Sequence, residues 1–580
     1  MVINSRWTVD IPRSSLQKWI FGSATEPLAD TKSFIDPENP DSNYITLSDY
    51  RLLSKRVALG LQKAGLKTGE RVLIFSGNNI FFPSIFLGVL MAGGIFTGAN
   101  PTMVTRELAY QLRDSGASYM FVAEAALKTG LEAAKEAGLP RDRVFILGGN
   151  TPVAPELIAS TNPSPGVQGK AEGARHWTEL LVGNRSQAEK WSWQEPADPE
   201  NTLCCLNYSS GTTGVPKGVM ITHYSYVANS VGVVYINNLD PQFQEKQKRA
   251  RMVCFLPLYH AYGQTYFVAT MPYLRTPVYI MQGFDFVKLL TYIQKFRITT
   301  LACVPPIVIA FAKHPAAKKF DLSSIESIGS GAAPLGLEVA REVEKLLPNA
   351  DYIRQGWGMT EVTCTAMAWD PNSTEGSSGG VGEMNPNCKA KLMSLDGKTE
   401  ITKAGERGEL WVSGPTLMRG YWNKPEQTAD TIVVDGDGTR WLKTGDISYV
   451  EKYEPGGIFH IVDRSKELIK VKGNQVAPAE LEALLLENPD VNDAAVVGVT
   501  INGEELPRAY IVRNPTSKAS EQDVAKWMEG KVTRYKRLKG GVVFVAEIPK
   551  NPSGKILRKI LRERAAKEVG DSAPKASKLA

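Results

Sequence analysis

The residues with the clearest chemical potential form one polar run, Ser209-Ser210-Gly211-Thr212-Thr213-Gly214-Val215-Pro216-Lys217-Gly218. Its glycines let backbone N–H groups approach an anion closely, its hydroxyls add donors, and Lys217 adds a positive charge. The run follows an apolar, strand-like segment at 202–208 but does not match the Gly-x-x-x-x-Gly-Lys-Ser/Thr spacing of the common nucleotide-hydrolase loop. An ordinary turn explains many such clusters. Six consecutive Ser, Thr or Gly residues before Val-Pro-Lys-Gly favour a phosphate-binding loop instead.

Seven more motifs follow this run along the chain. They are LPLYHAYG at 256–263, GSGAAPLG at 329–336, RQGWGMTE at 354–361, GELWVSGPTLMRGYWN at 408–423, WLKTGD at 441–446, DRSKELIKVKGNQVAPAELEALL at 463–485 and PKNPSGKILRK at 549–559. In these motifs and in their order the sequence resembles the adenylate-forming (AMP-binding) superfamily. Within it, the resemblance is to 4-coumarate–CoA ligase-like acyl- and aryl-CoA synthetases. The matches cover nearly the whole chain.

The resemblance implies a reaction in two halves that uses ATP, Mg²⁺ and CoA. A small carboxylic acid attacks the α-phosphorus of Mg·ATP, which gives an acyl- or aryl-adenylate and pyrophosphate. A thiol, expected to be that of CoA, then displaces AMP and forms a thioester. One cleft that binds both substrates supplies the proximity that two anions in solution lack.

The resemblance also assigns the nucleotide site residue by residue. The β- and γ-phosphates are expected on Ser209, Ser210, Gly211, Thr212, Thr213, Gly214 and Lys217, and the adenine slot on Gly331, Ala332, Gln355, Gly356 and Trp357. Trp357 stands where the family usually has Tyr, and either ring can stack on adenine. Thr360 should donate to the α-phosphate, and Glu361 should hold Mg²⁺, a hard cation that prefers oxygen ligands. Asp446 should accept hydrogen bonds from the ribose, and Arg464 should contact ribose or phosphate.

Catalysis is expected to alternate between two faces of a small C-terminal domain. Lys555, in the loop 551–555, is the expected cation of the first step, and His260 should orient the carboxylate or gate its tunnel. In the family this domain rotates about a hinge, a position that Lys466 occupies here. Rotation would withdraw Lys555 and bring the second-step residues to the site: Lys470, Lys472, Gly473 and Gln475.

The acid itself is left open by the sequence. The pocket is expected on His260, Tyr262, Tyr266, Gly329, Val362 and Cys364. Plant coumarate ligases typically have Ala-Gly-Pro-Val at 362–365, where this chain has Val-Thr-Cys-Thr, and a small residue at Tyr266. These differences predict a reshaped pocket rather than a strict 4-coumarate enzyme. Substituted cinnamates, benzoates, phenylacetates and medium-chain fatty acids all stay open, and Gly283, where the plant enzymes tend to carry Lys or Arg, leaves the CoA contacts open.

The elements that position these residues alternate between strand and helix. We expect a strand at 71–75, a buried helix at 80–91 and a connector at 150–200, which is rich in Pro, Ser, Gly and Asn. The prediction is an α/β fold with a large N-terminal domain of several layered subdomains (1–462), a hinge (463–467) and a small mobile α+β domain with a flexible tail (468–580).

Composition limits the function classes. Hydrophobic residues make up 43% of the 580 residues, and 67 Lys and Arg against 61 Asp and Glu give only +6, so a globular protein without a general nucleic-acid field is expected. Six cysteines are too few for a disulfide framework, and the five histidines lack metal-ligand spacing. The uncharged stretch 72–105 is broken by Asn, Pro and Gly, which favours a buried helix over a membrane span. No signal peptide is evident, so a cytoplasmic enzyme is expected. Ser577-Lys578-Leu579 resembles a peroxisomal address that the extra Ala580 should spoil.

Three other functions are weighed against the ligase. A stand-alone adenylation enzyme that loads a carrier protein is the main alternative, although the chain lacks the Asp that typically pairs with an amino acid and has no carrier segment after Glu568. A luciferase-like oxygenase and a non-catalytic adenylate-binding scaffold are the others. Intact Lys217, Glu361 and Lys555 argue against the scaffold. The oligomeric state stays open.

Overall fold

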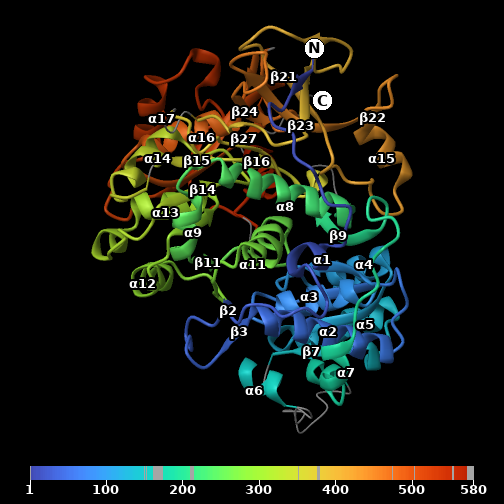
Figure 1. Cartoon of the computed structure of the whole chain (residues 1–580). Helices are drawn as coiled ribbons and strands as arrows, with labels where there is room; N and C mark the ends of the chain where they lie inside the picture. Colours follow the sequence, from blue (N-terminus) through green and yellow to red (C-terminus); the bar gives the residue numbers. More distant parts are fainter. Residues whose placement is uncertain are drawn as a thin grey trace, which may run out of the picture.

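The computed structural model describes residues 2–148, 151, 153–160, 174–209, 215–350, 352–374, 379–472, 474–501, 503–551 and 554–570. Figure 1 shows the helices and strands of residues 44–147 (blue) gathered at one end of the molecule and the middle of the chain around a central group of helices. The last elements (red) lie at the other end, where the N-terminus lies as well. Within the described residues there are three seven-stranded sheets and a small C-terminal unit.

The first sheet carries the phosphate-loop motif at its edge. Its order is β10-β9-β5-β4-β6-β7-β8, and its strands are parallel except for the pair β9–β10. The strands read as apolar runs because helices cover both faces. Their bounds are Arg71–Phe75 (β4), Ile95–Ala99 (β5), Ala117–Ala123 (β6), Val144–Leu147 (β7), Arg175–His176 (β8), Leu203–Ser209 (β9) and Lys217–Thr222 (β10); the helices include Leu47–Lys63 (α2), Phe82–Met91 (α3), Thr105–Ser115 (α4) and Leu127–Ala137 (α5).

The uncharged stretch confirms the expectation of a buried helix. β4 spans the expected strand at 71–75, and every residue of α3 is buried. Its ten residues fall well short of the roughly 20 that a membrane span requires. Among the helices of the described residues, none has the length and hydropathy to cross a bilayer.

The second sheet builds the floor of the candidate site. Its order is β15-β14-β13-β11-β12-β2-β3, parallel except for β3, so the carboxyl ends of β13, β14 and β15 meet at one edge. In open α/β sheets, ligands bind at such an edge. The strands are Lys32–Ile35 (β2), Tyr44–Thr46 (β3), Met252–Cys254 (β11), Val278–Ile280 (β12), Thr300–Cys303 (β13), Ser327–Ser330 (β14) and Ile353–Gln355 (β15); the helices are His223–Asn238 (α8), Phe243–Arg249 (α9), Met271–Leu274 (α11), Phe286–Phe296 (α12), Pro305–Lys313 (α13) and Leu337–Glu344 (α14).

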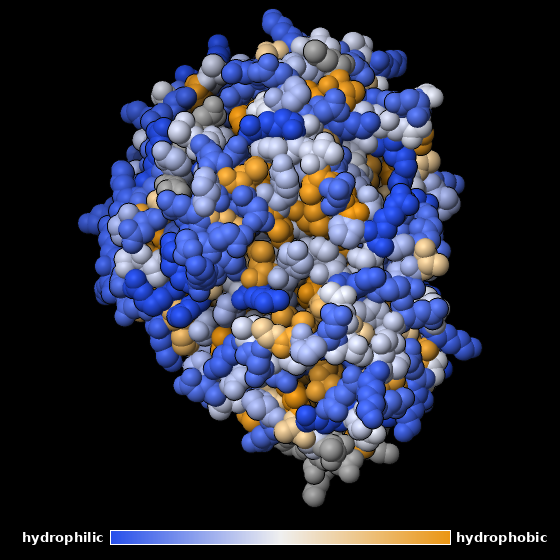
Figure 2. Space-filling view, viewed as in Figure 1, coloured by the Kyte–Doolittle hydropathy of each residue, from blue (hydrophilic) through white to orange (hydrophobic). Residues whose placement is uncertain are grey.

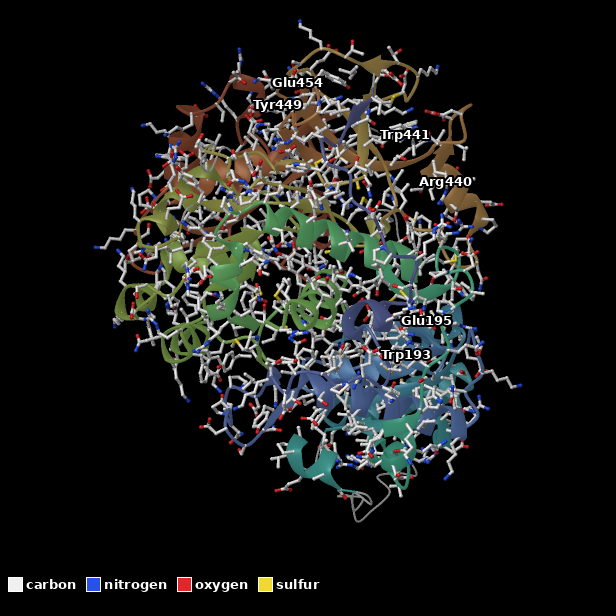
Figure 3. All side chains as sticks on the ribbon, in the orientation of Figure 1. Trp193, Glu195, Arg440, Trp441, Tyr449 and Glu454 are labelled. Carbon is white, nitrogen blue, oxygen red and sulfur yellow. The ribbon has the colours of Figure 1, made fainter. Side chains whose placement is uncertain are left out.

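The third sheet is antiparallel and carries the TGD and DRSKE motifs. Its strands are Ile3–Asn4 (β1), Lys389–Met393 (β19), Glu400–Ile401 (β20), Gly408–Ser413 (β21), Ile432–Val434 (β22), Arg440–Val450 (β23) and Phe459–Arg464 (β24), and the helix Pro425–Thr431 (α15) precedes β22. Figure 3 labels three residues of β23, Arg440, Trp441 and Tyr449. The Arg440 guanidinium donates to the carbonyls of Met418 and Arg419, which ties β23 to the segment before α15.

The chain from Ile469 onward forms the small α+β unit that the sequence predicts. It comprises Ile469–Val471 (β25), Asn474–Val476 (β26), Pro478–Glu487 (α16), Val491–Ile501 (β27), Glu504–Arg513 (β28), Glu521–Glu529 (α17), Val542–Phe544 (β29) and Arg558–Gly570 (α18). Lys313 Nζ on α13 donates to the Leu486 carbonyl on α16 at 2.9 Å, so this unit is docked on the second sheet's helices. The predicted fold class, a large layered α/β part with a small α+β part, is confirmed.

The expectation of a bare connector at 150–200 is wrong in part. The described residues there contain Ala154–Ala159 (α6), a 3₁₀ turn at Trp177–Leu181 and Arg185–Lys190 (α7), and Trp177 is fully buried. Gly60 lets the 3₁₀ turn press against α2, because a Cβ at that position would lie 2.2 Å from the Leu180 carbonyl oxygen. Trp193 and Glu195 (Figure 3) follow α7, and Glu195 accepts hydrogen bonds from the N–H and hydroxyl of Ser15. Residues 161–173 lie outside the described residues, as does the near-terminal Ser-Lys-Leu.

Candidate active site

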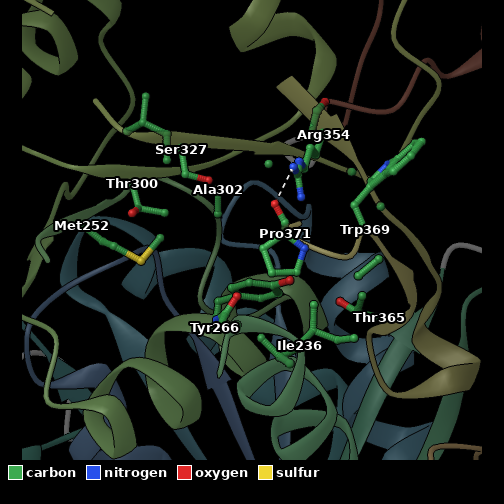
Figure 4. A pocket seen from close by; sticks show the side chains of 18 of the residues that line it. Ile236, Met252, Tyr266, Thr300, Ala302, Ser327, Arg354, Thr365, Trp369 and Pro371 are labelled. Atoms are coloured by element: carbon green, nitrogen blue, oxygen red, sulfur yellow. Dashed lines mark hydrogen bonds between the residues drawn. The ribbon is translucent and has the colours of Figure 1, made fainter. Parts of the chain in front are cut away.

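A cavity of about 700 Å³ lies between the second sheet and α8, α11 and the π-helix Gln264–Thr270. Figure 4 shows Thr300, Ala302 and Ser327 of the sheet on one side and Tyr266 and Ile236 across from them. π-Helical turns occur frequently at functional sites because they displace side chains from their regular helical positions. The cavity size falls within the range of small-molecule sites.

A cluster of charged side chains lies at the end of the cavity near the carboxyl edge of the sheet. Asp446 on β23 and Arg464 on β24 are paired across the two strands, and Arg464 Nε lies 3.1 Å from Asp446 Oδ1. Lys555 reaches the same cluster from the C-terminal unit. Burial and the neighbouring Arg464 charge lower the Lys555 pKa to about 8, while Asp446 and Glu361 act in the opposite direction. An ammonium group with this pKa is mostly protonated at neutral pH.

The approach of Lys555 depends on a tight turn. Gly554 has φ +80°, and a Cβ there would lie 3.1 Å from Val304 Cγ2 and from Pro306 Cγ at the end of β13. The Asn551 side chain accepts from the Lys555 N–H at 2.8 Å, and the Asn551 carbonyl accepts from the Gly554 N–H at 2.8 Å. Asn551 thus shapes the loop. Its place in the Asn-Pro-Ser-Gly-Lys motif was the sequence signal, although only Lys555 was singled out from that motif.

His260 faces the same end of the cavity as a neutral imidazole. Burial and the nearby Lys555 charge lower the His260 pKa to about 4. Its Nδ1 accepts the backbone N–H of Tyr262 at 3.3 Å, so the single ring proton of the neutral form lies on Nε2. His260 can therefore donate one hydrogen bond from Nε2 into the cavity, a geometry suited to a carboxylate oxygen.

The structure brings the expected adenine-slot residues together. It also shows a hydrogen bond from Trp357 that the sequence did not reveal. Gly331, Ala332, Gln355, Gly356 and Trp357 all line the cavity. The Gln355 side-chain amide accepts the N–H of Leu335 and donates to the carbonyl of the same residue, so it holds the 331–335 loop in place. The Trp357 indole N–H donates to Asp446 Oδ2 at 2.8 Å, within a buried pair. A Trp at this position therefore connects the expected adenine and ribose sites.

Glu361 is the centre of a second polar group beside the phosphate-loop motif. Its Oε1 accepts from the hydroxyls of Ser209 at 3.1 Å and Tyr421 at 3.0 Å, and the residue is 6% exposed. Lys217 Nζ lies 4.7 Å from the centroid of the Tyr421 ring. Burial raises the Tyr421 pKa well above its ordinary value, and the Glu361 charge adds to the shift. The sequence alone did not single out Tyr421, although it lies in the motif Gly-Tyr-Trp-Asn.

The phosphate-loop motif itself is described only at its two ends. Ser209 and Lys217 are opposite each other in the β9–β10 hairpin, next to Glu361 and Tyr421. Ser210, Gly211, Thr212, Thr213 and Gly214 lie outside the described residues. Thr360 lines the cavity one residue before Glu361. The ends of the motif thus meet the Thr-Glu pair at one point of the molecule.

The expected second-step residues lie elsewhere. Lys470, Lys472 and Gln475 are exposed on the β25–β26 hairpin, and none of them lines the cavity. Lys472 Nζ pairs with Glu504 at 3.1 Å, and the Lys470 N–H donates to Glu505 at 2.9 Å. Gly473 lies outside the described residues, and Lys466 is exposed on the turn after β24. The structure therefore brings Lys555, and not Lys470, to the site.

Five of the six expected acid-pocket residues line the cavity: His260, Tyr262, Tyr266, Gly329 and Cys364. The Tyr262 and Tyr266 rings meet edge to face at 5.1 Å between centroids. Val362 does not fit the expectation, because its side chain is fully buried in the hydrophobic core and is not among the lining residues. The tight turn at Thr363, with φ +68°, directs Cys364 rather than Val362 to the cavity.

Family models and curated relatives match this chain over nearly its whole length. A family model described as AMP-binding enzyme matches residues 23–422, and one described as AMP-binding enzyme C-terminal domain matches residues 480–555. The phenylacetyl-CoA ligase epaB of Aspergillus niger is 35% identical over 569 residues, which are 97% of this chain and 99% of that protein. The 4-coumarate–CoA ligase 1 of Petroselinum crispum is 36% identical over 527 residues, 90% of this chain and 89% of that protein.

Solved structures share the fold. The anthranilate CoA ligase AuaEII in complex with anthranoyl-AMP superposes with a TM-score of 0.80 at 23% identity and covers 97% of this chain and 99% of its own. ATP-bound MatB from Rhodopseudomonas palustris superposes with a TM-score of 0.78 at 24% identity, with 96% and 99% covered. The layered large part and the small C-terminal part therefore occur together in other chains of similar length.

Proposed function

The chain belongs to the AMP-binding enzyme family, and on that premise we propose that it is an ATP-dependent carboxylic acid–CoA ligase. It forms an acyl- or aryl-adenylate with release of pyrophosphate, and then a CoA thioester with release of AMP. The observation that carries the proposal is the position of Lys555. A lysine from the small domain lies within electrostatic reach of Asp446, Arg464 and Glu361, and Asp446 is hydrogen-bonded to Trp357, which lines the cavity.

In the first half-reaction the acid lies with its carboxylate next to His260 and Lys555. The Nε2–H of neutral His260 orients one carboxylate oxygen, so that the other oxygen can attack the α-phosphorus. The Lys555 ammonium stabilises the negative charge that the carboxylate and phosphate share as the new bond forms. Such fixed charges in a water-poor site contribute more than they would in solution. Thr360 donates to the α-phosphate at the same place.

The nucleotide is held by the side chains that meet at Asp446. Its carboxylate accepts the ribose hydroxyls, and the Trp357 indole and the Arg464 guanidinium keep that carboxylate in position. Ser209 and Lys217, with the loop between them, hold the β- and γ-phosphates.

The side chains at Glu361 fit the Mg²⁺ that accompanies ATP. Within the described residues no cluster of three or more His, Cys, Asp or Glu could hold a metal alone, and Mg²⁺ typically binds through one or two carboxylates together with substrate phosphates. Glu361 is the carboxylate next to the phosphate loop, and Ser209 and Tyr421 hold its Oε1 in place. When bound, the ion would neutralise phosphate charge.

The second half-reaction needs the small domain in another orientation. The hinge lies at 463–467, where the chain leaves β24, and Lys466 is its exposed residue. Rotation about it withdraws Lys555 and carries the hairpin with Lys470, Lys472 and Gln475 toward the thioester. The ion pair of Lys472 with Glu504 has both partners on the small domain, so it can survive that rotation.

A panel of carboxylic acids with Mg·ATP, with and without CoA, tests the proposal. Pyrophosphate release reports the adenylate, and mass spectrometry identifies the thioester. Lys555→Ala is expected to reduce pyrophosphate release by at least about 100-fold, the usual loss for removal of one group that stabilises transition-state charge. Lys559→Ala is the matched control, because Lys559 is exposed on α18 and, among the residues that the structure describes, forms an ion pair with Glu563 alone.

Three outcomes would contradict parts of the proposal. Full pyrophosphate release by Lys555→Ala would remove Lys555 from the first step. Adenylate without any CoA thioester would favour a carrier protein as acceptor. No adenylate from any acid would refute the ligase as a whole.

A further inference from the structure

The cavity continues far beyond the place where a small aryl acid would end. It follows β13 and β14 along their whole length, from Gly331 and Ala332 at the nucleotide end to Glu326 and Ser327 at the opposite end. Gly331 lies four residue steps after Ser327, which corresponds to about 13 Å along a strand. A phenyl ring with a short side chain would occupy roughly the first half of that distance.

Small side chains keep the middle of the cavity open. Ala302 and Gly329 are register partners on the sheet face that lines it. A Cβ built on Gly329 would meet no atom within 4 Å, and its φ lies outside the left-handed region. The glycine is therefore not required by the backbone. Its absent side chain leaves a passage instead.

Apolar side chains line part of the deeper half, next to polar ones such as that of Thr300. Met252 lies beside Thr300 on the sheet, and Ile236, Met271 and Leu274 line the helical side. Figure 2 shows hydrophobic side chains gathered in the middle of this face of the molecule, over α8 and α11. An apolar chain that enters this half would leave water along most of its length.

The far rim is polar, and its charges are paired with one another. Lys246 Nζ lies 2.8 Å from Asp240 Oδ2, and Arg249 Nε lies 2.6 Å from Glu326 Oε1. In the middle of the cavity, Arg354 on β15 is the register partner of Gly329, and its guanidinium donates to backbone carbonyls, among them that of Pro371 (Figure 4). With these partners in place, the rim does not need a charged group on the substrate.

We propose that the acid substrate is extended, with a largely apolar body about ten carbon atoms long whose far end passes between Ala302, Gly329 and Tyr266 toward Ser327. The length follows from about 13 Å divided by about 1.25 Å per carbon in a staggered chain of roughly 1.5 Å bonds. An aliphatic chain and an aryl ring with an alkyl tail share this chemistry. The inference rests on the proposed ligase function and specifies its substrate class.

Two substitutions on one strand measure the depth of the cavity. Gly329→Leu should obstruct it halfway, and Ser327→Leu should obstruct it two residues deeper, about 7 Å or five carbon atoms farther on. Both positions face the cavity, whereas Ile328 between them is buried on the other side of the sheet. Gly436→Leu is the control, because Gly436 is an exposed glycine away from the cavity whose Cβ would also meet nothing within 4 Å.

The assay is pyrophosphate release with straight-chain acids of four to fourteen carbons, phenylacetate and 4-hexylphenylacetate. In the unaltered enzyme, kcat/KM should rise about fourfold per methylene up to about ten carbons, equivalent to about 0.8 kcal/mol for each buried CH₂. The rise should end near five carbons in Gly329→Leu. Ser327→Leu, which obstructs the cavity only at its far end, should keep the limit near ten, as should Gly436→Leu. A comparison of kcat/KM for 4-hexylphenylacetate and for phenylacetate tells whether the enzyme accepts a ring near His260.

The outcomes separate this inference from the ligase function. Thioester formation from short or aryl acids only, with the same length profile in Gly329→Leu as in the unaltered enzyme, would overturn the inference and leave the ligase standing. If none of the acids supported pyrophosphate release, both the extended substrate and the ligase function would be refuted. Displacement of a fluorescent fatty acid from the ATP-free protein provides a second measurement, and equal displacement by hexanoate and decanoate would contradict the extended cavity.

Discussion

The hydrogen bond between Trp357 and Asp446 makes a prediction that separates two roles of one ring. Trp357→Phe keeps an aromatic face for adenine, and it removes part of the ring together with the indole N–H that donates to Asp446 Oδ2 at 2.8 Å. Asp446 is 5% exposed, so water cannot readily replace that donor. A hydrogen bond to a charged group contributes about 1.5–3 kcal/mol, which corresponds to a loss of roughly 10- to 150-fold.

The loss should appear in a particular kinetic constant. Asp446 is expected to hold the ribose before and during the reaction, so the interaction is equally strong in the ground and transition states. Such a loss raises KM for ATP and leaves kcat nearly unchanged. Steady-state pyrophosphate release at varied ATP and saturating acid measures both constants. Trp357→Tyr, which restores the ring type usual in the family, should lie between the Phe variant and the unaltered enzyme.

A second tryptophan on the same strand as Asp446 provides the control. Trp441 on β23 is 1% exposed, and within the described part of the chain its indole N–H has no hydrogen-bond partner. Trp441→Phe therefore removes similar bulk without the loss of an indole hydrogen bond, and its KM for ATP should stay within about twofold. An unchanged KM in Trp357→Phe, or an equal rise in Trp441→Phe, would refute the reasoning.

Two further predictions concern the docked lysine. Because the Lys555 pKa is lowered to about 8, the fraction of protonated ammonium declines as pH rises through 8, so kcat/KM for adenylation should fall there. Lys555→Arg should be slower, but its kcat/KM should not fall in this pH range. A fall with the same midpoint in both enzymes would exclude Lys555 as its origin. Gly554→Val should lower the rate of adenylation about tenfold or more, since the added Cβ would press on Val304 and Pro306 and the backbone has φ +80°. The reaction of supplied acyl-adenylate with CoA should change little. An equal loss in both half-reactions would argue for general misfolding.

Much of the local structure was accessible from the sequence. The strand at 71–75 and the helix ending at Met91 follow from apolar runs bounded by Asn, Pro and Gly. The order of motifs identified the family, since each motif is a short run whose chemistry needs those residue types together. The error at 150–200 has a different origin. The burial of Trp177 depends on the close approach that Gly60 permits from another helix, and periodicity within the segment carries no trace of that contact.

Sequence by itself determined which residues could bind phosphate, orient a carboxylate and supply a cation, because these capacities belong to side chains and to short runs of backbone. Only the tertiary structure decided which of them meet. Lys555 reaches Asp446 and Glu361, whereas Lys470 stays on an outer hairpin, and both lysines carry the same charge. The link from Trp357 to Asp446 joins residues 89 positions apart. The length of the cavity depends on Ala302 and Gly329 lying side by side on neighbouring strands, because an empty volume arises from the packing of many elements and is encoded in no single motif.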